Sequence, residues 1–242
     1  MTAEGLFSGL VLADVHQDIF RNIVSLRVSE DLNDDLSDDP AEREAAIRLE
    51  LAFKPHPFES ALPIIHRPFE EAVWNDAIGF PFINWMKSRY SDGSFGVWYG
   101  AGDMETSVFE TAYHWVGRLL SDAEGYLRPG VTIERKIYRV CCDAALVDFR
   151  KAVKKFPALI HPQDYSFTHQ VGARLDHEGH PGLITQSARC GGEVEAIFNP
   201  GVLSNPRQHC YLTYQTTGKG IMVERTPGKP WMKIPLEHLQ PS

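Results

Sequence analysis

Residues 89–114 read RYSDGSFGVWYGAGDMETSVFETAYH, and this stretch decides the fold that we expect. Residues 95–101 are aromatic and β-branched and are bracketed by glycines, which is typical of a short buried strand. Asp103 then predicts the start of a helix that runs to about residue 120, because an Asp side chain caps free backbone N–H groups. The apolar face of this helix carries Val108, Ala112, Trp115 and Leu119. The stretch therefore predicts a strand that leads directly into an amphipathic helix.

The sequence after this unit mixes helix and strand signals. Runs of β-forming residues predict strands at 132–142, 182–187, 194–198, 210–215 and 221–224. Helical spacing predicts a helix over 165–175 and another that carries Leu146, Phe149, Val153 and Phe156 on one side. Because these elements do not alternate as regular βαβ units, the pattern favours an α+β fold over a doubly wound sheet.

The sequence before the unit has a different character. Leu12, Val15, Ile19, Ile23 and Leu26 recur every three or four residues and predict an amphipathic helix. A second helix is predicted after Asp39-Pro40, with Ala41, Ala45, Leu49 and Phe53 on one face. Lys54-Pro55-His56-Pro57 cannot continue a helix and predicts a linker. We therefore expect a helical, acidic N-terminal extension over 1–57 and a main domain over 58–242.

Charge and composition exclude several classes of protein. The chain has 242 residues, 43% of them hydrophobic, and a net charge of −8. Residues 30–44 alone carry −7, so the main domain is close to neutral and no direct nucleic-acid binding is expected. The sequence lacks an apolar run of about 18 residues and a signal peptide, and its four cysteines form no CxxC pair. These features predict a cytoplasmic protein with no membrane association.

Motifs for metals and common cofactors are weak or missing. His177 and His180 are three residues apart, but Pro181 and Gly182 follow at once, so the pair lies in a turn and we expect no metal site. The sequence contains no GxGxxG, no GxxxxGK[ST] and no GxSxG. By residue type alone, Arg89 and Glu110 are most simply read as solvated side chains.

Three ordered elements carry a family resemblance. Arg89, Tyr99 and Glu110 follow one another at intervals of ten and eleven residues. An earlier arginine, Arg67, follows Ile64-Ile65-His66. A late element runs from Gly182 through Ser187-Ala188-Arg189 to Gly191-Gly192 and the sequence Ala196-Ile197-Phe198-Asn199-Pro200.

Together these elements resemble the RES domain, a family named for its Arg, Glu and Ser residues, with a core at about 64–215. Two features depart from the family pattern. Ser88-Arg89-Tyr90-Ser91 stands where the family usually has Gly-Arg-Trp-Asn, and residues 1–55 have no counterpart in short members. For this extension two roles stay open, a built-in regulator and an element that forms a homo-oligomer.

The resemblance implies a fold, an activity and a partner. The implied fold is an ADP-ribosyltransferase-like central split β-sheet with flanking helices. The implied activity is NAD⁺ degradation by a toxin of a bacterial toxin–antitoxin pair, as an NAD⁺ phosphorylase or NAD⁺ glycohydrolase. NAD⁺ is then a substrate, phosphate is a candidate co-substrate, and no resident cofactor is expected. The implied partner is a small antitoxin with a helix-turn-helix part, through which any DNA contact would run.

The resemblance also suggests a role for each matched residue. A carboxylate near the ribose stabilises an oxocarbenium-like transition state, and Glu110 is the candidate for that role. Arg67 and Arg89 suit the pyrophosphate, because a guanidinium binds phosphate oxygens in pairs. Tyr99 would pack on the nicotinamide or ribose, and Ser187 would hydrogen-bond the ribose or carboxamide. The predicted catalytic residues are therefore Arg89, Glu110 and Ser187. The predicted substrate-binding residues are Arg67, Tyr99, His114, which lies one turn beyond Glu110, and Arg189.

Two other functions stay open beside NAD⁺ degradation. A mono-ADP-ribosyltransferase that modifies a protein often carries Glu or Gln two residues before the catalytic Glu, and Val108 stands there instead. This difference mildly favours free NAD⁺ as the substrate. The other alternative is an inactive module that only binds a partner. The acceptor of the ADP-ribosyl group, whether phosphate, water or a protein side chain, is also left open by the sequence.

Overall fold

One large mixed β-sheet organises the computed structural model, which describes residues 4–25, 72–120 and 128–239. The described strands have the spatial order β1-β2-β5-β4-β3-β6-β7-β8, with a further pairing between β1 and β3. The strands are β1 (Leu12–Val24), β2 (Trp98–Ala101), β3 (Thr132–Asp148), β4 (Gly182–Gln186), β5 (Glu193–Ile197), β6 (Leu203–Thr217), β7 (Gly220–Thr226) and β8 (Lys229–Pro235).

Five strands close a ring within this sheet. β1 pairs with β3 in antiparallel register from Leu12–Val147 to Val24–Arg135, and a single bridge joins Phe20 of β1 to Ala101 of β2. β2 continues through β5 and β4, and β4 runs parallel to the end of β3. β6, β7 and β8 extend the sheet from β3 as antiparallel neighbours. The first strand of the chain is therefore built into the centre of the fold.

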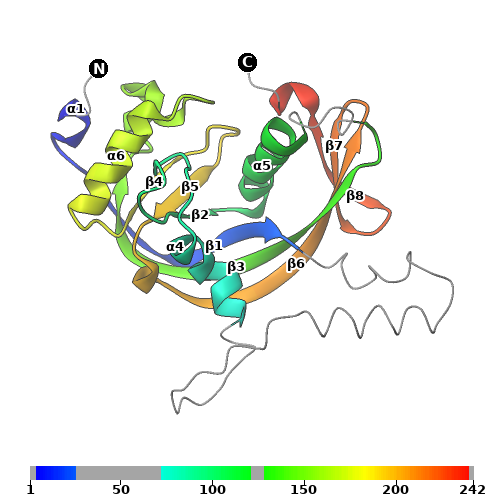
Figure 1. Ribbon diagram of the computed structural model, residues 1–242, viewed down its shortest axis with the longest axis horizontal. Coiled ribbons are helices and arrows are strands. Elements are labelled where there is room, and N and C mark those ends of the chain that lie inside the picture. Colours follow the sequence, from blue (N-terminus) through cyan, green and yellow to red (C-terminus); the bar gives the residue numbers. More distant parts are fainter. Residues whose placement is uncertain (1–3, 26–71, 121–127, 240–242) are drawn as a thin grey trace, which may run out of the picture.

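The described helices pack against the sheet. They are α1 (Glu4–Phe7), α4 (Phe80–Ile83), α5 (Met104–His114) and α6 (Ser166–His177). π-helical turns span Asn75–Gly79 and Trp115–Leu120, and 3₁₀ turns span Ala152–Lys154, Pro157–Ile160, Pro200–Val202 and Leu236–His238. α5 and α6 lie on the same side of the long strands β3 and β6, which curve beneath both helices (Figure 1). No helix in the described ranges is long and apolar enough to cross a membrane.

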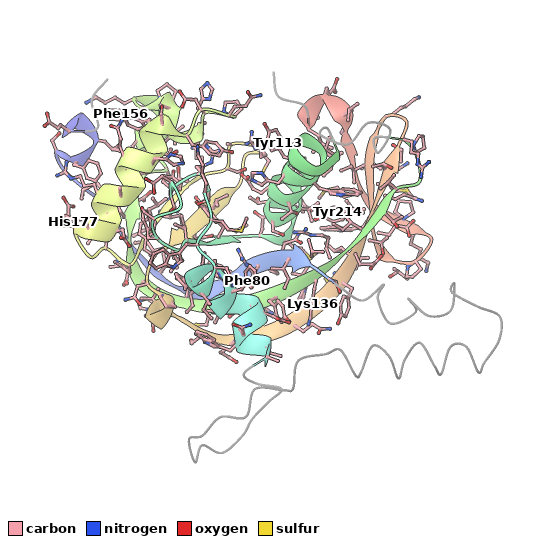
Figure 2. All side chains as sticks on the ribbon, in the orientation of Figure 1. Phe80, Tyr113, Lys136, Phe156, His177 and Tyr214 are labelled. Atoms are coloured by element: carbon pink, nitrogen blue, oxygen red, sulfur yellow. The ribbon has the colours of Figure 1, made fainter. Side chains whose placement is uncertain are left out.

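Separate apolar clusters anchor the two longer helices. Val171 and Leu175 of α6 pack with Phe156 in one cluster. Tyr113 of α5 packs with Tyr214 of β6 in another. Figure 2 shows Phe156 at the α6 side of the molecule and the two tyrosines at the α5 side. Each helix is therefore held independently, with the short strands β2, β4 and β5 between them.

Most of the predicted elements are confirmed. The structure contains the predicted strand before Asp103, the helix after it, the helix beginning near residue 165, and all five strands predicted downstream. The edge strand β8 was not predicted. The large mixed sheet flanked by helices confirms the α+β class.

The predicted helix over residues 12–26 is wrong, because residues 12–24 form β1. Val15 and Ile19 are buried, and a spacing of four residues fits one face of a strand as well as one face of a helix. Pairing with β3 along all of β1 decides between the two. Residues 12–24 are therefore part of the main sheet and not of a helical extension.

The predicted helix around residue 150 is also wrong. Leu146 belongs to β3, and a 3₁₀ turn carries Val153, although the four apolar residues of the predicted face are all buried. The second predicted helix, the linker at 54–57 and the boundary at 57–58 lie outside the described residues.

Candidate active site

Helix α5 presents a polar face to a cavity of about 430 Å³. The Asp103 side chain caps this helix by accepting a hydrogen bond from the Thr106 backbone N–H at 2.7 Å. Ser107, Glu110, Thr111 and His114 line the cavity, and their spacing of three and four residues places them on one helical face. The opposite face is buried in the apolar core. The cap and the core together fix how α5 points its polar groups.

The other cavity walls come from strands and loops that are distant in the sequence. They are formed by Phe20, Arg21 and Asn22 of β1, Lys87 to Tyr90, Tyr99 to Ala101 of β2, Trp115, Arg135, Tyr165, Thr185, Gln186, Ala188 and Val194. Four of the described lining residues are cationic at neutral pH, namely Arg21, Lys87, Arg89 and Arg135, and only Glu110 among them is a carboxylate. The cavity is therefore suited to an anionic ligand, although the chain as a whole is acidic.

The loop that follows β4 supplies the side chains that contact the Glu110 carboxylate. Ser187 Oγ donates a hydrogen bond to Glu110 Oε1 at 2.6 Å, and Arg189 Nε lies 3.9 Å from Oε2. The same Ser187 Oγ accepts from the backbone N–H groups of Arg189 at 3.0 Å and Cys190 at 3.3 Å. Both Glu110 oxygens thus have a partner on the protein side.

The Arg189 side chain is buried next to the Glu110 carboxylate. It is only 4% exposed, its guanidinium lies over the Tyr113 ring, and Nη2 donates to the Pro162 carbonyl at 2.7 Å. Burial lowers the pKa of Arg189, and the neighbouring Glu110 opposes that shift. These contacts fix the guanidinium beside Glu110 and away from the cavity.

Gly192 allows the loop to approach α5. Its carbonyl accepts from the Ser187 N–H at 2.8 Å, which closes the turn that carries the serine. A Cβ atom at Gly192 would lie 1.8 Å from Thr106 Oγ1, so any larger residue would push the loop away from the helix. This close approach explains the glycine at position 192 of the late sequence element.

Arg89 and Tyr99 also line the cavity, and neighbouring groups hold both side chains in place. Arg89 Nη1 donates to the His161 carbonyl at 2.8 Å, and its guanidinium lies 4.6 Å from the centre of the Tyr165 ring. Tyr99 donates to Ser88 Oγ at 2.9 Å and accepts from the Tyr90 N–H at 2.9 Å. Burial raises the pKa of Tyr99 to about 12, so its hydroxyl keeps its proton and these contacts.

β1 and β3 contribute Arg21, Asn22 and Arg135 to the cavity wall, and this group is called the Arg21 end below. Arg21 Nη1 donates to the Tyr99 carbonyl at 2.8 Å. Arg135 Nε donates to Asn22 Oδ1 at 2.8 Å, and Asn22 Nδ2 donates to Tyr214 at 2.8 Å and to Thr111 at 3.1 Å. Asn22 thus ties the arginine of β3 to helix α5. This end contains no residue that the sequence singled out.

The comparisons with known proteins now decide the family. A family model of the RES domain matches residues 64–217, which is more than half of the chain. The chain belongs to the RES-domain family. In structure it is similar to a chain of the M. tuberculosis MbcT–MbcA toxin–antitoxin complex, with a TM-score of 0.44 and 10% sequence identity. That match covers 84% of this chain and 86% of the other. No curated protein matches the sequence.

The structure brings most of the predicted RES-domain residues together. Arg89, Tyr99, Glu110 and His114 line the cavity. Ser187 and Arg189 do not line it but contact Glu110 from behind. Arg67 lies outside the described residues. The direct substrate contacts of all these residues stay predictions.

Among the cavity residues of this RES protein that the sequence did not single out are Arg21, Asn22 and Arg135. Arg21 and Asn22 precede the matched segment and were placed on a predicted helix. No local pattern could have placed them on a strand, because the four-residue spacing of Val15, Ile19 and Ile23 fits one face of either element. The described residues contain no group of three metal-ligating side chains.

Proposed function

We propose that this RES-domain protein cleaves the nicotinamide–ribose bond of NAD⁺. The observation that carries the proposal is a carboxylate, Glu110, held on two sides by Ser187 and Arg189 at the wall of a cation-rich cavity. Cleavage breaks the bond between ribose C1″ and the nicotinamide nitrogen, and the electron pair leaves with neutral nicotinamide. A fixed carboxylate next to C1″ stabilises the positive charge that develops on the ribose.

The surrounding residues have distinct proposed roles. Ser187 and Arg189 are positioning residues, because both act on Glu110 and neither lines the cavity. Arg89 is positioned to meet the pyrophosphate, and Tyr99 and His114 form the wall against which the nicotinamide or ribose would pack. An oxygen of phosphate or water then attacks C1″, which makes the protein an NAD⁺ phosphorylase or an NAD⁺ glycohydrolase.

We also propose that the protein is the toxin of a toxin–antitoxin pair and acts in the cytoplasm. Membership in the RES-domain family supports this role, as it supports a small helix-turn-helix antitoxin as partner and a fold related to ADP-ribosyltransferases. Expression of the chain alone should arrest growth and deplete NAD⁺, and Glu110→Gln should relieve both effects. Growth arrest with normal NAD⁺ levels would instead contradict the link between activity and toxicity.

Substitution of Glu110 tests the activity directly. Glu110→Gln removes the charge and keeps the shape, so NAD⁺ consumption by the purified full-length protein should fall about 10³-fold. Glu105→Gln is the matched control, since Glu105 is exposed on the first turn of the same helix. Equal NAD⁺ consumption by wild type and Glu110→Gln would overturn the proposal.

A further inference from the structure

The cavity wall also holds two arginines that have no role in the proposed Glu110 chemistry. Arg21 of β1 and Arg135 of β3 both line the cavity. The described residues place no carboxylate within salt-bridge distance of either guanidinium. Buried charges in proteins are normally paired or hydrogen-bonded, since removing them from water is unfavourable.

Arg21 has a vacant hydrogen-bond donor. Its guanidinium lies 5.3 Å from the centre of the Trp98 ring, and Nη1 is used by the Tyr99 carbonyl. The Nε atom is buried and has no partner among the described residues. The aromatic ring and the carbonyl hold the guanidinium in place while this donor stays unused.

Arg135 is fixed beside Arg21 with its charge uncompensated. The residue is 8% exposed, and its Nε and Nη2 donate to Asn22 Oδ1 and to the Asn22 carbonyl at 2.8 and 3.0 Å. Both acceptors are neutral. Burial and the neighbouring Arg135 together lower the pKa of Arg21 to about 10, which is the effect of two like charges held close in a dry site.

We propose that Arg21 and Arg135 form a subsite for a phosphate-class oxyanion at the Arg21 end of the cavity. Guanidinium groups bind phosphate oxygens through paired hydrogen bonds, and two positive charges match a phosphoryl dianion better than a carboxylate monoanion. The bound anion neutralises the pair of charges that has no anionic partner among the described residues. This inference rests on the proposed function only in naming the molecule that carries the phosphoryl group.

Two sources share this chemistry: a phosphoryl group of NAD⁺ and free orthophosphate as the acceptor. Their kinetics differ. If the subsite holds a phosphoryl group of NAD⁺, added orthophosphate competes with NAD⁺ and raises its KM. If the subsite holds the acceptor, orthophosphate raises the rate of NAD⁺ consumption to a plateau. In both cases substitution of Arg135 removes the effect of orthophosphate.

Direct binding of inorganic phosphate tests the subsite without NAD⁺. Phosphate is titrated into the full-length protein at constant ionic strength, with chloride as the comparison, and binding is followed by ³¹P NMR and by the thermal unfolding midpoint. Wild type should show saturable binding, and Arg135→Met should weaken it about 10–100-fold. Arg207→Met is the matched control, because Arg207 is an exposed strand arginine that pairs with Asp18.

A second variant covers the case in which Arg135→Met does not fold. Arg21→Lys keeps the positive charge but loses the planar guanidinium that binds phosphate oxygens in pairs, so phosphate should bind several-fold more weakly to a folded protein. Phosphate binding that is equal in wild type, Arg21→Lys and Arg135→Met overturns the proposal, as does wild type that shows no saturable effect. If phosphate binds as expected but NAD⁺ is not consumed, the proposed function fails and the subsite stands.

Discussion

The two ends of the cavity differ in how completely the protein satisfies their charged groups. At one end, the Glu110 carboxylate has Ser187 on one oxygen and Arg189 near the other. At the other end, Arg21 and Arg135 have only neutral hydrogen-bond partners among the described residues. The contacts of Glu110 hold its carboxylate in one position. Two neighbouring cations with neutral partners can bind an anionic ligand. The difference suggests that the first end performs the chemistry and the second end provides binding.

This comparison predicts different kinetic effects at the two ends. Substitutions behind Glu110 should lower kcat, because they disturb a group that acts in the transition state. Substitutions around Arg21 and Arg135 should raise KM, because they disturb a group that holds the substrate equally in the ground state and the transition state.

The largest of these effects is expected for Ser187→Ala. Loss of the hydroxyl frees one Glu110 oxygen, so kcat for NAD⁺ consumption should fall about 10–100-fold with little change in KM. Ser187→Thr keeps a hydroxyl and should restore part of the rate. Ser94→Ala is the control, because Ser94 is exposed and bonds only locally to Asp92. A rise in KM without a fall in kcat would mean that Ser187 contacts the substrate itself.

A smaller effect is expected for Asn22→Ala at the other end. Asn22 accepts from Arg135 and donates to Tyr214, so its loss frees the Arg135 guanidinium. KM for NAD⁺ should rise about tenfold while kcat stays near the wild-type value. The unfolding midpoint is measured in parallel, since Asn22 also links β1 to α5. A fall in kcat at unchanged KM would contradict the proposal that the Arg21 end contributes to binding and not to the chemical step.

No effect on activity is expected for Glu195→Gln, although Glu195 is a buried ionisable residue whose carboxyl oxygens have no hydrogen-bond partner among the described residues. It lies on β5 next to Val194, and alternation along the strand turns it away from the cavity. Burial raises the pKa of Glu195 to about 8, so the folded protein keeps a proton that the unfolded chain releases above about pH 4.5. Wild-type stability should therefore fall as pH rises through this window, by several kcal/mol in total.

Thermal unfolding of wild type and Glu195→Gln between pH 5 and 9 measures this contribution. The amide does not titrate, so the stability difference between the two proteins should shift in favour of the variant as pH rises. Glu237→Gln, at an exposed carboxyl, should keep the wild-type pH dependence. A difference between wild type and Glu195→Gln that is constant over this range would contradict the raised pKa.

The Glu110 end could be predicted from the sequence because each group of its residues lies within a short stretch of the chain. Asp103 caps the helix that carries Glu110 and His114, and Ser187, Arg189 and Gly192 lie on one loop, so the short motifs of the RES-domain resemblance contain these groups. What spacing could not show is the contact between helix and loop. The structure adds that Ser187 and Arg189 support Glu110 from behind, where the sequence predicted contacts with the substrate.

The Arg21 end could not be predicted because only the pairing of distant strands brings its residues together. Asn22 and Arg135 are 113 residues apart, and the pairing of β1 with β3 brings them together. The spacing of Val15 and Ile19 fits a helix and a strand equally, and long-range pairing decided for the strand. Predicting this end required the register of β1, which no local pattern contains.

Nicotinamide release from NAD⁺ tests the account most directly. Purified full-length protein is incubated with NAD⁺, with and without orthophosphate, and the products are followed by ¹H and ³¹P NMR. We predict one free nicotinamide for each NAD⁺ lost, an intact pyrophosphate in the ADP-ribosyl product, and neither product with Glu110→Gln. NAD⁺ that stays intact, or that is split at the pyrophosphate, would contradict the account.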